Sequence, residues 1–141
     1  MTDWSLRVRY HECDPQGVVF NAHYMAWADM GSMELWREGF GGYEQLVEAG
    51  WEAVVVAAEL RFLRPARFDE QLAATTLVQA VGRTSFALDT TFARDGERLA
   101  AVRVRYVFVG ADLATPTPPP DDVRAGLLAR MAAPGDDPFA R

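Results

Sequence analysis

The chain has 141 residues, of which 50% are hydrophobic and 24% charged; this composition fits one globular domain and excludes a disordered chain or a coiled coil. Its 14 basic and 20 acidic residues give a formal charge of −6, which disfavours nucleic acid as the main partner because such binding needs a basic face. No apolar run is long enough to span a bilayer, and no signal-peptide pattern is visible. The single cysteine, Cys13, excludes an internal disulfide and makes the cytoplasm the expected compartment.

The first third of the chain predicts a strand, a tight turn and one long helix. Residues 6–10 alternate between apolar and basic side chains, as a strand does, and residues 13–17 are rich in turn formers. Asn21 stands where a helix N-cap is expected, and Gly39 together with residues 41–42 ends the helical pattern. The apolar face of this helix, which we expect to be buried, comprises Tyr24, Ala28, Gly31 and Leu35, with Trp27 and Met30 beside them.

Residues 51–109 have the pattern of an antiparallel sheet. Residues 53–58 are continuously apolar, as expected of a strand that is covered on both faces. Apolar and polar side chains alternate in residues 71–81, 84–93 and 102–108. The Asp-Gly pair at 95–96 predicts a hairpin between the last two of these strands.

The sequence pattern of the C-terminal part of the chain, from about residue 115 to 141, predicts no further strand of the sheet. Residues 115–120 are rich in proline and should be extended, and the aspartates at 121–122 are expected to cap a short helix that ends near residue 131. We expect the residues after this helix to be loose. The whole pattern predicts an α+β domain. Because one helix cannot cover both faces of a curved sheet, we also expect a dimer or a higher oligomer.

Residues 9–24 carry the most informative chemistry in the sequence. Asp14 ends a predicted strand, and a proline and a glycine follow before the chain turns into the helix near Asn21. The free backbone amides at the start of a helix can polarise a carbonyl oxygen, while a nearby carboxylate attacks the carbon or activates water. The alternative is structural: Asp14 hydrogen-bonds its own backbone in a tight turn.

The string Asp-Pro-x-Gly-Val-Val-Phe, followed by Asn-Ala-His-Tyr and an amphipathic helix, resembles the hydroxybenzoyl-CoA thioesterase family of hot-dog-fold enzymes. The resemblance is strongest over residues 8–36. It implies a single hot-dog domain over residues 1–141, with one long helix wrapped by a curved antiparallel sheet. It also implies hydrolysis of an acyl-CoA or aroyl-CoA to the free acid and CoA, without a metal or redox cofactor. The active site is expected at the interface of a homodimer, and two dimers could form a homotetramer.

The resemblance also implies roles for individual residues. Asp14 matches the family's catalytic aspartate, either as nucleophile or as general base, and the Asn21 amide matches the group that polarises the thioester oxygen. Gly17 matches the glycine that brings the loop close to the substrate, and Asp29 falls where one branch of the family has a supporting glutamate. Val18, His23 and Tyr24 complete the expected oxyanion and substrate-binding set. Asn21 departs from the histidine or tyrosine common at this position, and His23 follows two residues later.

Arginines that suit the phosphates of CoA form a second group of candidates. Arg61, Arg64 and residue 67 cluster after a predicted strand, and Arg83 lies two residues before Ser85 on another strand. The CoA-binding set that we expect is Arg61, Arg64, Arg83 and Ser85; the alternative is a strand edge protected by solvated charge. Residues 11–14 look like metal ligands, but neighbours on a strand point to opposite faces, so we expect no metal.

Two other functions remain open at this point. A non-catalytic module that binds acyl-CoA or an acyl carrier is favoured by the departure at Asn21. A hot-dog dehydratase is the weaker alternative, because the histidine loop that characterises those enzymes is absent from this sequence.

Overall fold

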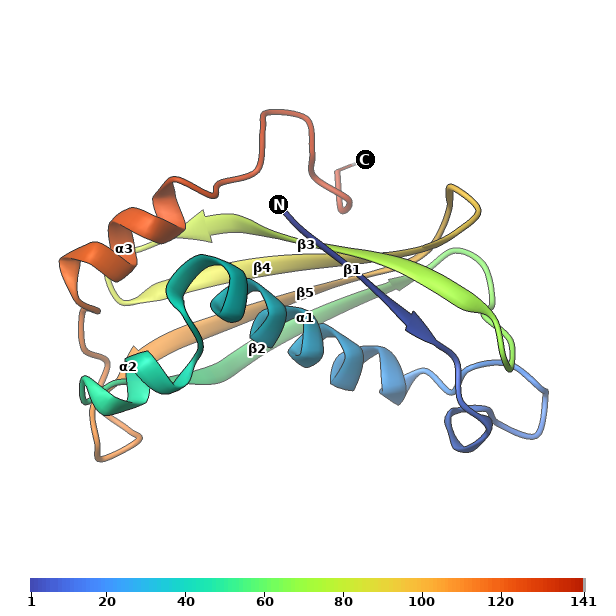
Figure 1. Cartoon of the computed structure of the whole chain (residues 1–141), viewed down its shortest axis with the longest axis horizontal. Helices are drawn as coiled ribbons and strands as arrows, with labels where there is room; N and C mark the ends of the chain where they lie inside the picture. The colour runs from blue at the N-terminus through green and yellow to red at the C-terminus, as the bar shows by residue number, and fades with distance from the viewer. Residues whose placement is uncertain (141) are drawn as a thin grey trace.

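Within residues 1–140, which this computed structural model describes, a curved antiparallel sheet of five strands wraps around one long helix, α1 (Figure 1). The strands lie in the order β1-β3-β4-β5-β2. The elements in chain order are β1 (Thr2–Arg7), a 3₁₀ turn (Tyr10–Glu12), α1 (Ala22–Phe40), α2 (Glu44–Glu48), β2 (Glu52–Phe62), β3 (Gln71–Val81), β4 (Ser85–Arg94), β5 (Glu97–Val109) and α3 (Asp121–Leu128). This architecture confirms the predicted α+β fold with a long helix inside an antiparallel sheet. Arg141 lies outside the described residues.

Helix α1 lies against the concave face of the sheet and buries the face predicted from its apolar spacing. Its buried residues are Tyr24, Trp27, Ala28, Gly31, Ser32, Leu35 and Trp36. Met30, which was expected beside them, is 43% exposed because it lies outside this stripe. The helix ends at Gly41, whose φ of 74° is a left-handed conformation that costs a glycine little.

The first strand differs from its prediction. It spans Thr2–Arg7 and pairs with β3, whereas alternation predicted residues 6–10. Val8 is still buried, and its amide donates to the carbonyl of Glu70, but the chain then turns into the 3₁₀ segment and leaves Tyr10 82% exposed. The Glu12 side chain stabilises this turn by accepting hydrogen bonds from the Arg9 amide and the Trp27 indole. The alternation of apolar and polar residues does not indicate these contacts.

Strand β2 is an edge of the sheet, and the exposure of its middle residues shows that the prediction of cover on both faces for residues 53–58 is wrong for a single chain. Its one partner among residues 1–140 is β5. Val55 and Val56 are 47% and 54% exposed. The apolar run therefore leaves a long, open strand edge on the isolated chain.

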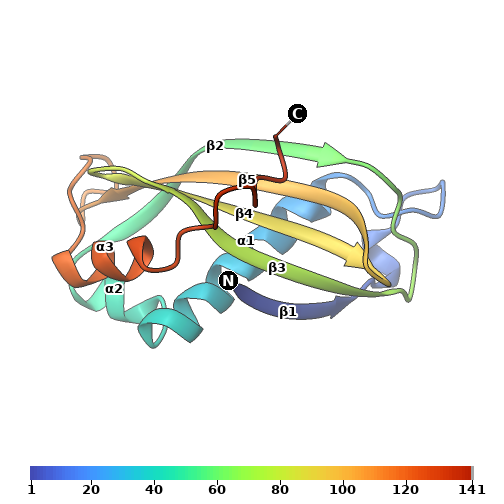
Figure 2. The same cartoon turned by 90° about the horizontal axis from the view of Figure 1, so that it is seen from above.

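The residues after α3 are not loose, contrary to the prediction. The helix itself ends at Leu128 rather than near residue 131, and the chain then crosses the outer face of the sheet (Figure 2). The amide of Ala132 donates to the carbonyl of Val78 at 2.7 Å, and Phe139 is only 8% exposed. Helix α2, which was not predicted, links α1 to β2. Among the helices within residues 1–140, none is both long and apolar enough to cross a membrane.

Candidate active site

The loop between the 3₁₀ turn and α1 is a small hairpin that carries Asp14. The amide of Asp14 donates to the carbonyl of Val18 at 2.8 Å, and the amide of Gly17 donates to the carbonyl of Asp14 at 2.9 Å. Gly17 has φ of 77°, a conformation that favours glycine and lets the loop turn within four residues. The amide of Val19 donates to the carbonyl of Ala66, so the loop is also fixed to the segment between β2 and β3.

Asp14 is half-buried, and one of its oxygens has a structural partner. Oδ1 accepts a hydrogen bond from the amide of Gln16 at 2.8 Å, which is the turn expected as the alternative to catalysis. Within residues 1–140, Oδ2 accepts no hydrogen bond. A carboxylate held by one oxygen is oriented, and its second oxygen remains able to take a proton or attack a carbon. The two readings of Asp14 are therefore compatible.

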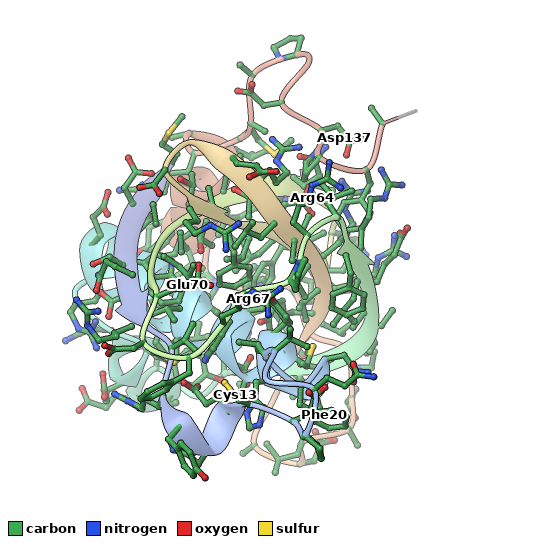
Figure 3. All side chains as sticks on the ribbon, turned by 90° about the vertical axis from the view of Figure 1, so that its right-hand side faces the viewer. Cys13, Phe20, Arg64, Arg67, Glu70 and Asp137 are labelled. Atoms are coloured by element: carbon green, nitrogen blue, oxygen red, sulfur yellow. The ribbon has the colours of Figure 1, made fainter. Side chains whose placement is uncertain are left out.

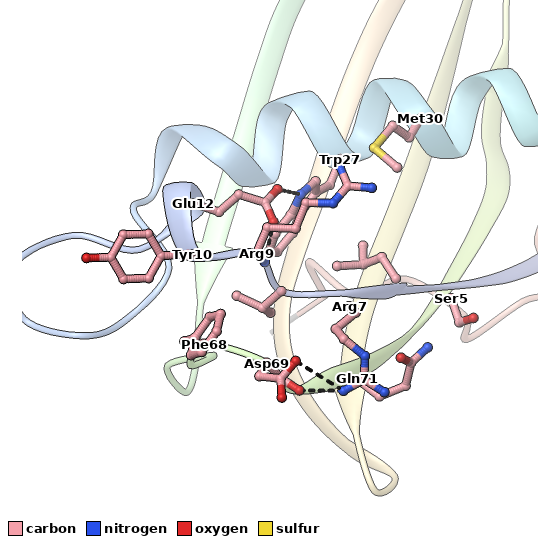
Figure 4. Close-up of a pocket in the computed structure, with 12 residues that line it drawn as sticks. Ser5, Arg7, Arg9, Tyr10, Glu12, Trp27, Met30, Phe68, Asp69 and Gln71 are labelled. Atoms are coloured by element: carbon pink, nitrogen blue, oxygen red, sulfur yellow. Dashed lines mark hydrogen bonds and ion pairs between the residues drawn. The ribbon is translucent and has the colours of Figure 1, made fainter.

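Glu12 anchors the loop to α1. Its side chain is 6% exposed, and it accepts hydrogen bonds from Trp27 Nε1 at 2.6 Å and from the amide of Arg9 at 2.7 Å (Figure 4). These bonds satisfy a buried carboxylate and tie the segment before Asp14 to the first turns of the helix. Sequence reasoning considered Glu12 only as a metal ligand, and no local pattern distinguishes this anchoring role.

Replacing this anchor should destabilise the protein. In Glu12→Ala, the indole N–H of Trp27 and the amide of Arg9 lose the buried side chain that accepts both of their hydrogen bonds. We therefore expect the free energy of unfolding to be about 2–4 kcal/mol lower than in wild type. Urea unfolding measures the difference. Glu38→Ala, at an exposed position of α1, is the matched control and should change stability by less than about 0.5 kcal/mol. Equal stability of both variants would contradict the anchoring role.

The start of α1 differs in detail from the prediction. Asn21 occupies the N-cap position, but its backbone is already helical, with φ −54° and ψ −34°, and its side chain makes no capping bond. The reason is that the amide of His23 already donates to the carbonyl of Phe20, so the first turn is closed one residue earlier. Among residues 1–140, no backbone oxygen accepts a hydrogen bond from the Asn21 amide. This amide is thus a free donor at the positive end of the helix.

Asp14 and the start of α1 line one cavity of about 300 Å³. Its lining residues are Asp14, Val18, Val19, Asn21, Tyr24, Phe62, Leu63, Arg64 and Pro65. The rings of Tyr24 and Phe62 lie 5.5 Å apart, edge to face. Burial raises the pKa of Tyr24 to about 12, so its phenol stays neutral at pH 7. Asp14, Asn21 with its free amide, and an apolar wall therefore line the same cavity.

A second cavity, of about 640 Å³, also has Asp14 in its lining. It is lined by His11, Cys13, Asp14, Pro15, Gln16, Phe20 and His23. The rings of His11 and His23 are 6.3 Å apart, edge to face. Desolvation, followed by the charges of Glu12 and Asp14, raises the pKa of the Cys13 thiol, which disfavours it as a nucleophile. Asp14 is the residue that the two cavities share.

Residues 8–127 match the thioesterase-like superfamily. The chain belongs to that superfamily. Acyl-CoA thioester hydrolase YbgC of Escherichia coli is 29% identical over 82 residues, which are 58% of this chain and 61% of YbgC. The chain thus matches less than two thirds of that relative's length. These findings confirm the family resemblance seen in the sequence.

Solved structures show that the thioesterase-like fold extends over nearly the whole chain. A hypothetical protein from Thermus thermophilus has a TM-score of 0.86 at 23% identity, covering 93% of this chain and 100% of that chain. A 1,4-dihydroxy-2-naphthoyl-CoA thioesterase from Synechocystis has a TM-score of 0.80 at 14% identity, covering 90% of this chain and 95% of that chain. At these identities, the likeness concerns the fold.

The arginines expected to bind CoA lie in three different settings in this thioesterase-like protein. Arg64 lines the Asp14 cavity, and its Nε donates to Glu97 at 3.1 Å; Figure 3 views this end of the molecule, with Arg64 and Arg67 above Cys13 and Phe20. Arg61 is bonded to the C-terminal residues instead. Arg83 and Ser85 lie at the far end of the sheet from this cavity. On β5, Ser85 pairs with Val107 and Phe62 pairs with Ala100, and these two positions of β5 are about 23 Å apart along the strand.

Asp29 also lies outside the Asp14 cavity. It is exposed on α1, and one of its carboxylate oxygens accepts a hydrogen bond from the hydroxyl of Tyr106 at 3.2 Å.

A further cavity, of about 540 Å³, lies between β1 and α1 and includes Arg7, Arg9 and Phe68, but no residue of the predicted oxyanion, substrate-binding or CoA-binding sets (Figure 4). Within residues 1–140, no three histidines, cysteines, aspartates or glutamates are grouped to hold a metal ion.

Proposed function

We propose that this protein is an acyl-CoA thioesterase that hydrolyses an acyl-CoA or aroyl-CoA to the free acid and CoA. The observation that carries the proposal is the 300 Å³ cavity that is lined by both Asp14 and Asn21, the residue whose amide donates to no backbone oxygen among residues 1–140. Membership of the thioesterase-like superfamily and the partial match to an acyl-CoA thioester hydrolase support the same chemistry. No metal or redox cofactor takes part in this proposal.

In this mechanism the thioester carbonyl oxygen accepts a hydrogen bond from the Asn21 amide, and the N-terminal end of α1 stabilises the charge that develops on it. The Asp14 carboxylate removes a proton from water as the water oxygen bonds to the carbonyl carbon. The carbon–sulfur bond then breaks, and the thiolate takes up a proton to leave as CoA. In the nucleophilic variant, the Asp14 carboxylate attacks the carbon and expels the CoA thiolate, which takes up a proton; water then hydrolyses the resulting anhydride to the free acid and regenerates Asp14.

The surroundings of the cavity suggest how substrate is held. Val18, Tyr24 and Phe62 provide an apolar surface for the acyl group, whereas Gly17 lines neither this cavity nor the second one and acts through the turn that it closes. Arg64 lies at the rim, where its charge suits a phosphate of CoA. His23 faces the second cavity and would contact the other arm of the thioester.

The remaining CoA-binding residues stay predictions, and their placement restricts how they can act. Arg83 and Ser85 are at the far end of the sheet from Asp14 in the same chain, so they can reach an active site only in another subunit. Asp29 has the same restriction, because it faces away from the Asp14 cavity. We therefore propose a homodimer as the working form; association of two dimers into a homotetramer is the further step expected from the family.

The open edge of β2 is the surface that we propose for this dimer. A long, apolar edge strand favours pairing with another strand, and a second copy supplies one of identical length and pattern. A lysine in the middle of the edge should prevent pairing, so Val56→Lys is expected to be monomeric by analytical ultracentrifugation. Val47→Lys, at an exposed position of α2, is the control and should leave the dimer intact. A dimeric Val56→Lys protein would place the interface elsewhere.

Thiol release from acetyl-, palmitoyl-, benzoyl- and phenylacetyl-CoA tests the proposed activity and ranks the substrate classes. Turnover of at least one thioester is the expected result. If the protein binds these thioesters without hydrolysing any of them, the non-catalytic binding module becomes the better account of the same cavity.

A further inference from the structure

The C-terminal segment, defined here as residues 137–140, is bound to the outer face of the sheet by a side chain of β2. Arg61 Nη1 donates to the carbonyl of Pro138 at 3.3 Å, and Nη2 donates to the carbonyl of Phe139 at 3.2 Å. The Phe139 ring lies between two guanidinium groups, 5.1 Å from Arg61 Cζ and 4.7 Å from Arg103 Cζ. Such cation–π contacts, together with burial of the ring, hold the segment against the sheet.

Arg103 makes this docking place rigid. Its Nε and Nη2 donate to the two carboxylate oxygens of Asp89, both at 2.7 Å, and Asp89 is fully buried. The same Nη2 donates to Asp137 Oδ1 at 2.7 Å, and this oxygen also accepts a hydrogen bond from the amide of Phe139 at 2.8 Å. The hydrogen bonds that Arg103 donates to Asp89 raise the pKa of Arg103 above its ordinary value, so this cation is permanently available to the segment.

Arg61 connects this docking place to the proposed active site through the backbone. Successive side chains of a strand point to opposite faces, so Arg61 faces the outer side while Phe62 faces the cavity. The chain leaves the sheet directly after Phe62, and Leu63 and Arg64 continue the cavity wall. Because β2 is an edge strand, its end is held by β5 on one side and by the C-terminal segment on the outer face.

We propose that the C-terminal segment is a positioning element of the active site: by holding Arg61, it fixes residues 62–64 in the geometry that binds the acyl group. This inference rests on the proposed function for its catalytic meaning, but its structural part stands independently. Phe139 and Arg61 touch no reacting atom and act through the wall that follows them. The Phe62 ring, which packs against Tyr24, is the part of the wall most directly affected.

Hydrogen exchange of the free protein tests the structural part. The amides of Leu63 and Arg64 both donate to the carbonyl of Leu99, at 2.8 and 3.0 Å, so their protection reports on the end of β2. In Phe139→Ala we expect both to exchange about tenfold faster or more, with no change at the Phe108 amide at the other end of the sheet. Unchanged protection of Leu63 and Arg64 would overturn the inference, whether or not any thioester is hydrolysed.

A matched control separates this effect from general loss of stability. Phe40 packs against the guanidinium of Arg130, 5.4 Å from its ring centroid, at the far end of α1. Phe40→Ala therefore removes a comparable contact away from the cavity and should leave the relative protection of Leu63 and Arg64 as in wild type. Faster exchange at these two amides in both variants would mean that stability alone is responsible.

Steady-state kinetics with a thioester that the wild type hydrolyses tests whether the C-terminal segment positions the active site. Phe139→Ala should raise KM about tenfold while kcat stays within about twofold, because the wall binds the acyl group and Asp14 is untouched. Phe139→Tyr, which keeps an aromatic ring between the two arginines, should restore KM. A KM that stays at the wild-type value while the amides of Leu63 and Arg64 exchange faster would show that the segment holds β2 without positioning substrate.

Discussion

Asp14→Asn should lose hydrolysis of CoA thioesters by about a hundredfold or more and remain folded. The asparagine side chain keeps the oxygen that accepts the Gln16 amide, so the hairpin loop retains its geometry. What it lacks is the negative charge, without which the group neither removes a proton from water nor attacks the thioester carbon. Thiol release measured side by side with wild type gives the ratio.

The matched control for this substitution is Asp69→Asn. Asp69 is exposed, lies near Arg7, and has φ of 65°, a conformation that asparagine also tolerates. Asp69→Asn removes one negative charge from the same end of the molecule, as Asp14→Asn does, but leaves the Asp14 cavity unchanged. The kcat/KM of this variant should therefore stay within about twofold of wild type. If Asp14→Asn and Asp69→Asn hydrolyse equally well, Asp14 is a turn residue and the chemistry belongs to another group.

Gly31→Ala should be strongly destabilising, by about 2–4 kcal/mol. A Cβ at this position would overlap the hydroxyl oxygen of Thr76 and lie 3.1 Å from that of Thr90 and 3.2 Å from the ring of Trp4. The two threonine oxygens are 3.0 Å apart and fully buried, so neither can move without breaking their hydrogen bond. The helix must therefore lift from the sheet. Urea unfolding is the measurement.

Gly39→Ala provides the contrast on the same helix. The atoms nearest to a Cβ there belong to the guanidinium end of the Arg130 side chain, which can shift at the expense of its hydrogen bond to the Gly126 carbonyl and its contact with Phe40. Alanine is also the better helix former by about 1 kcal/mol, so this variant should be as stable as wild type or more so. Destabilisation of Gly39→Ala to the same extent as Gly31→Ala would attribute the loss to the helix backbone and not to close packing on the sheet.

The elements that follow from local patterns were predicted well. Helix α1 has a buried face at helical spacing and glycines at its end, and its observed range agrees with both. The first strand and the C-terminal segment depend instead on distant partners. Glu12 finds Trp27, and Phe139 finds Arg61 and Arg103, across separations that leave no trace in composition or periodicity.

The candidate site divides in the same way. Asp14, Val18, Asn21 and Tyr24 lie in one cavity because the hairpin loop leads directly into the helix, and one contiguous motif specifies both. Phe62 belongs to that cavity through the curvature of the sheet, and nothing in its neighbourhood in the sequence indicates this. The apolar run of β2 predicted cover on both faces, and this prediction is wrong for the single chain, in which Val55 and Val56 are exposed.

The presence of Asp14 in the lining of two cavities has a consequence for how substrate preference can diverge. Apart from Asp14 the two cavities share no lining residue, although α1 contributes to both, with Tyr24 in the first and His23 in the second. A thioester has one arm on each side of its reacting carbon. Under the function proposed above, a substitution in one cavity can change the recognition of one arm of the thioester and leave the lining of the other cavity unchanged.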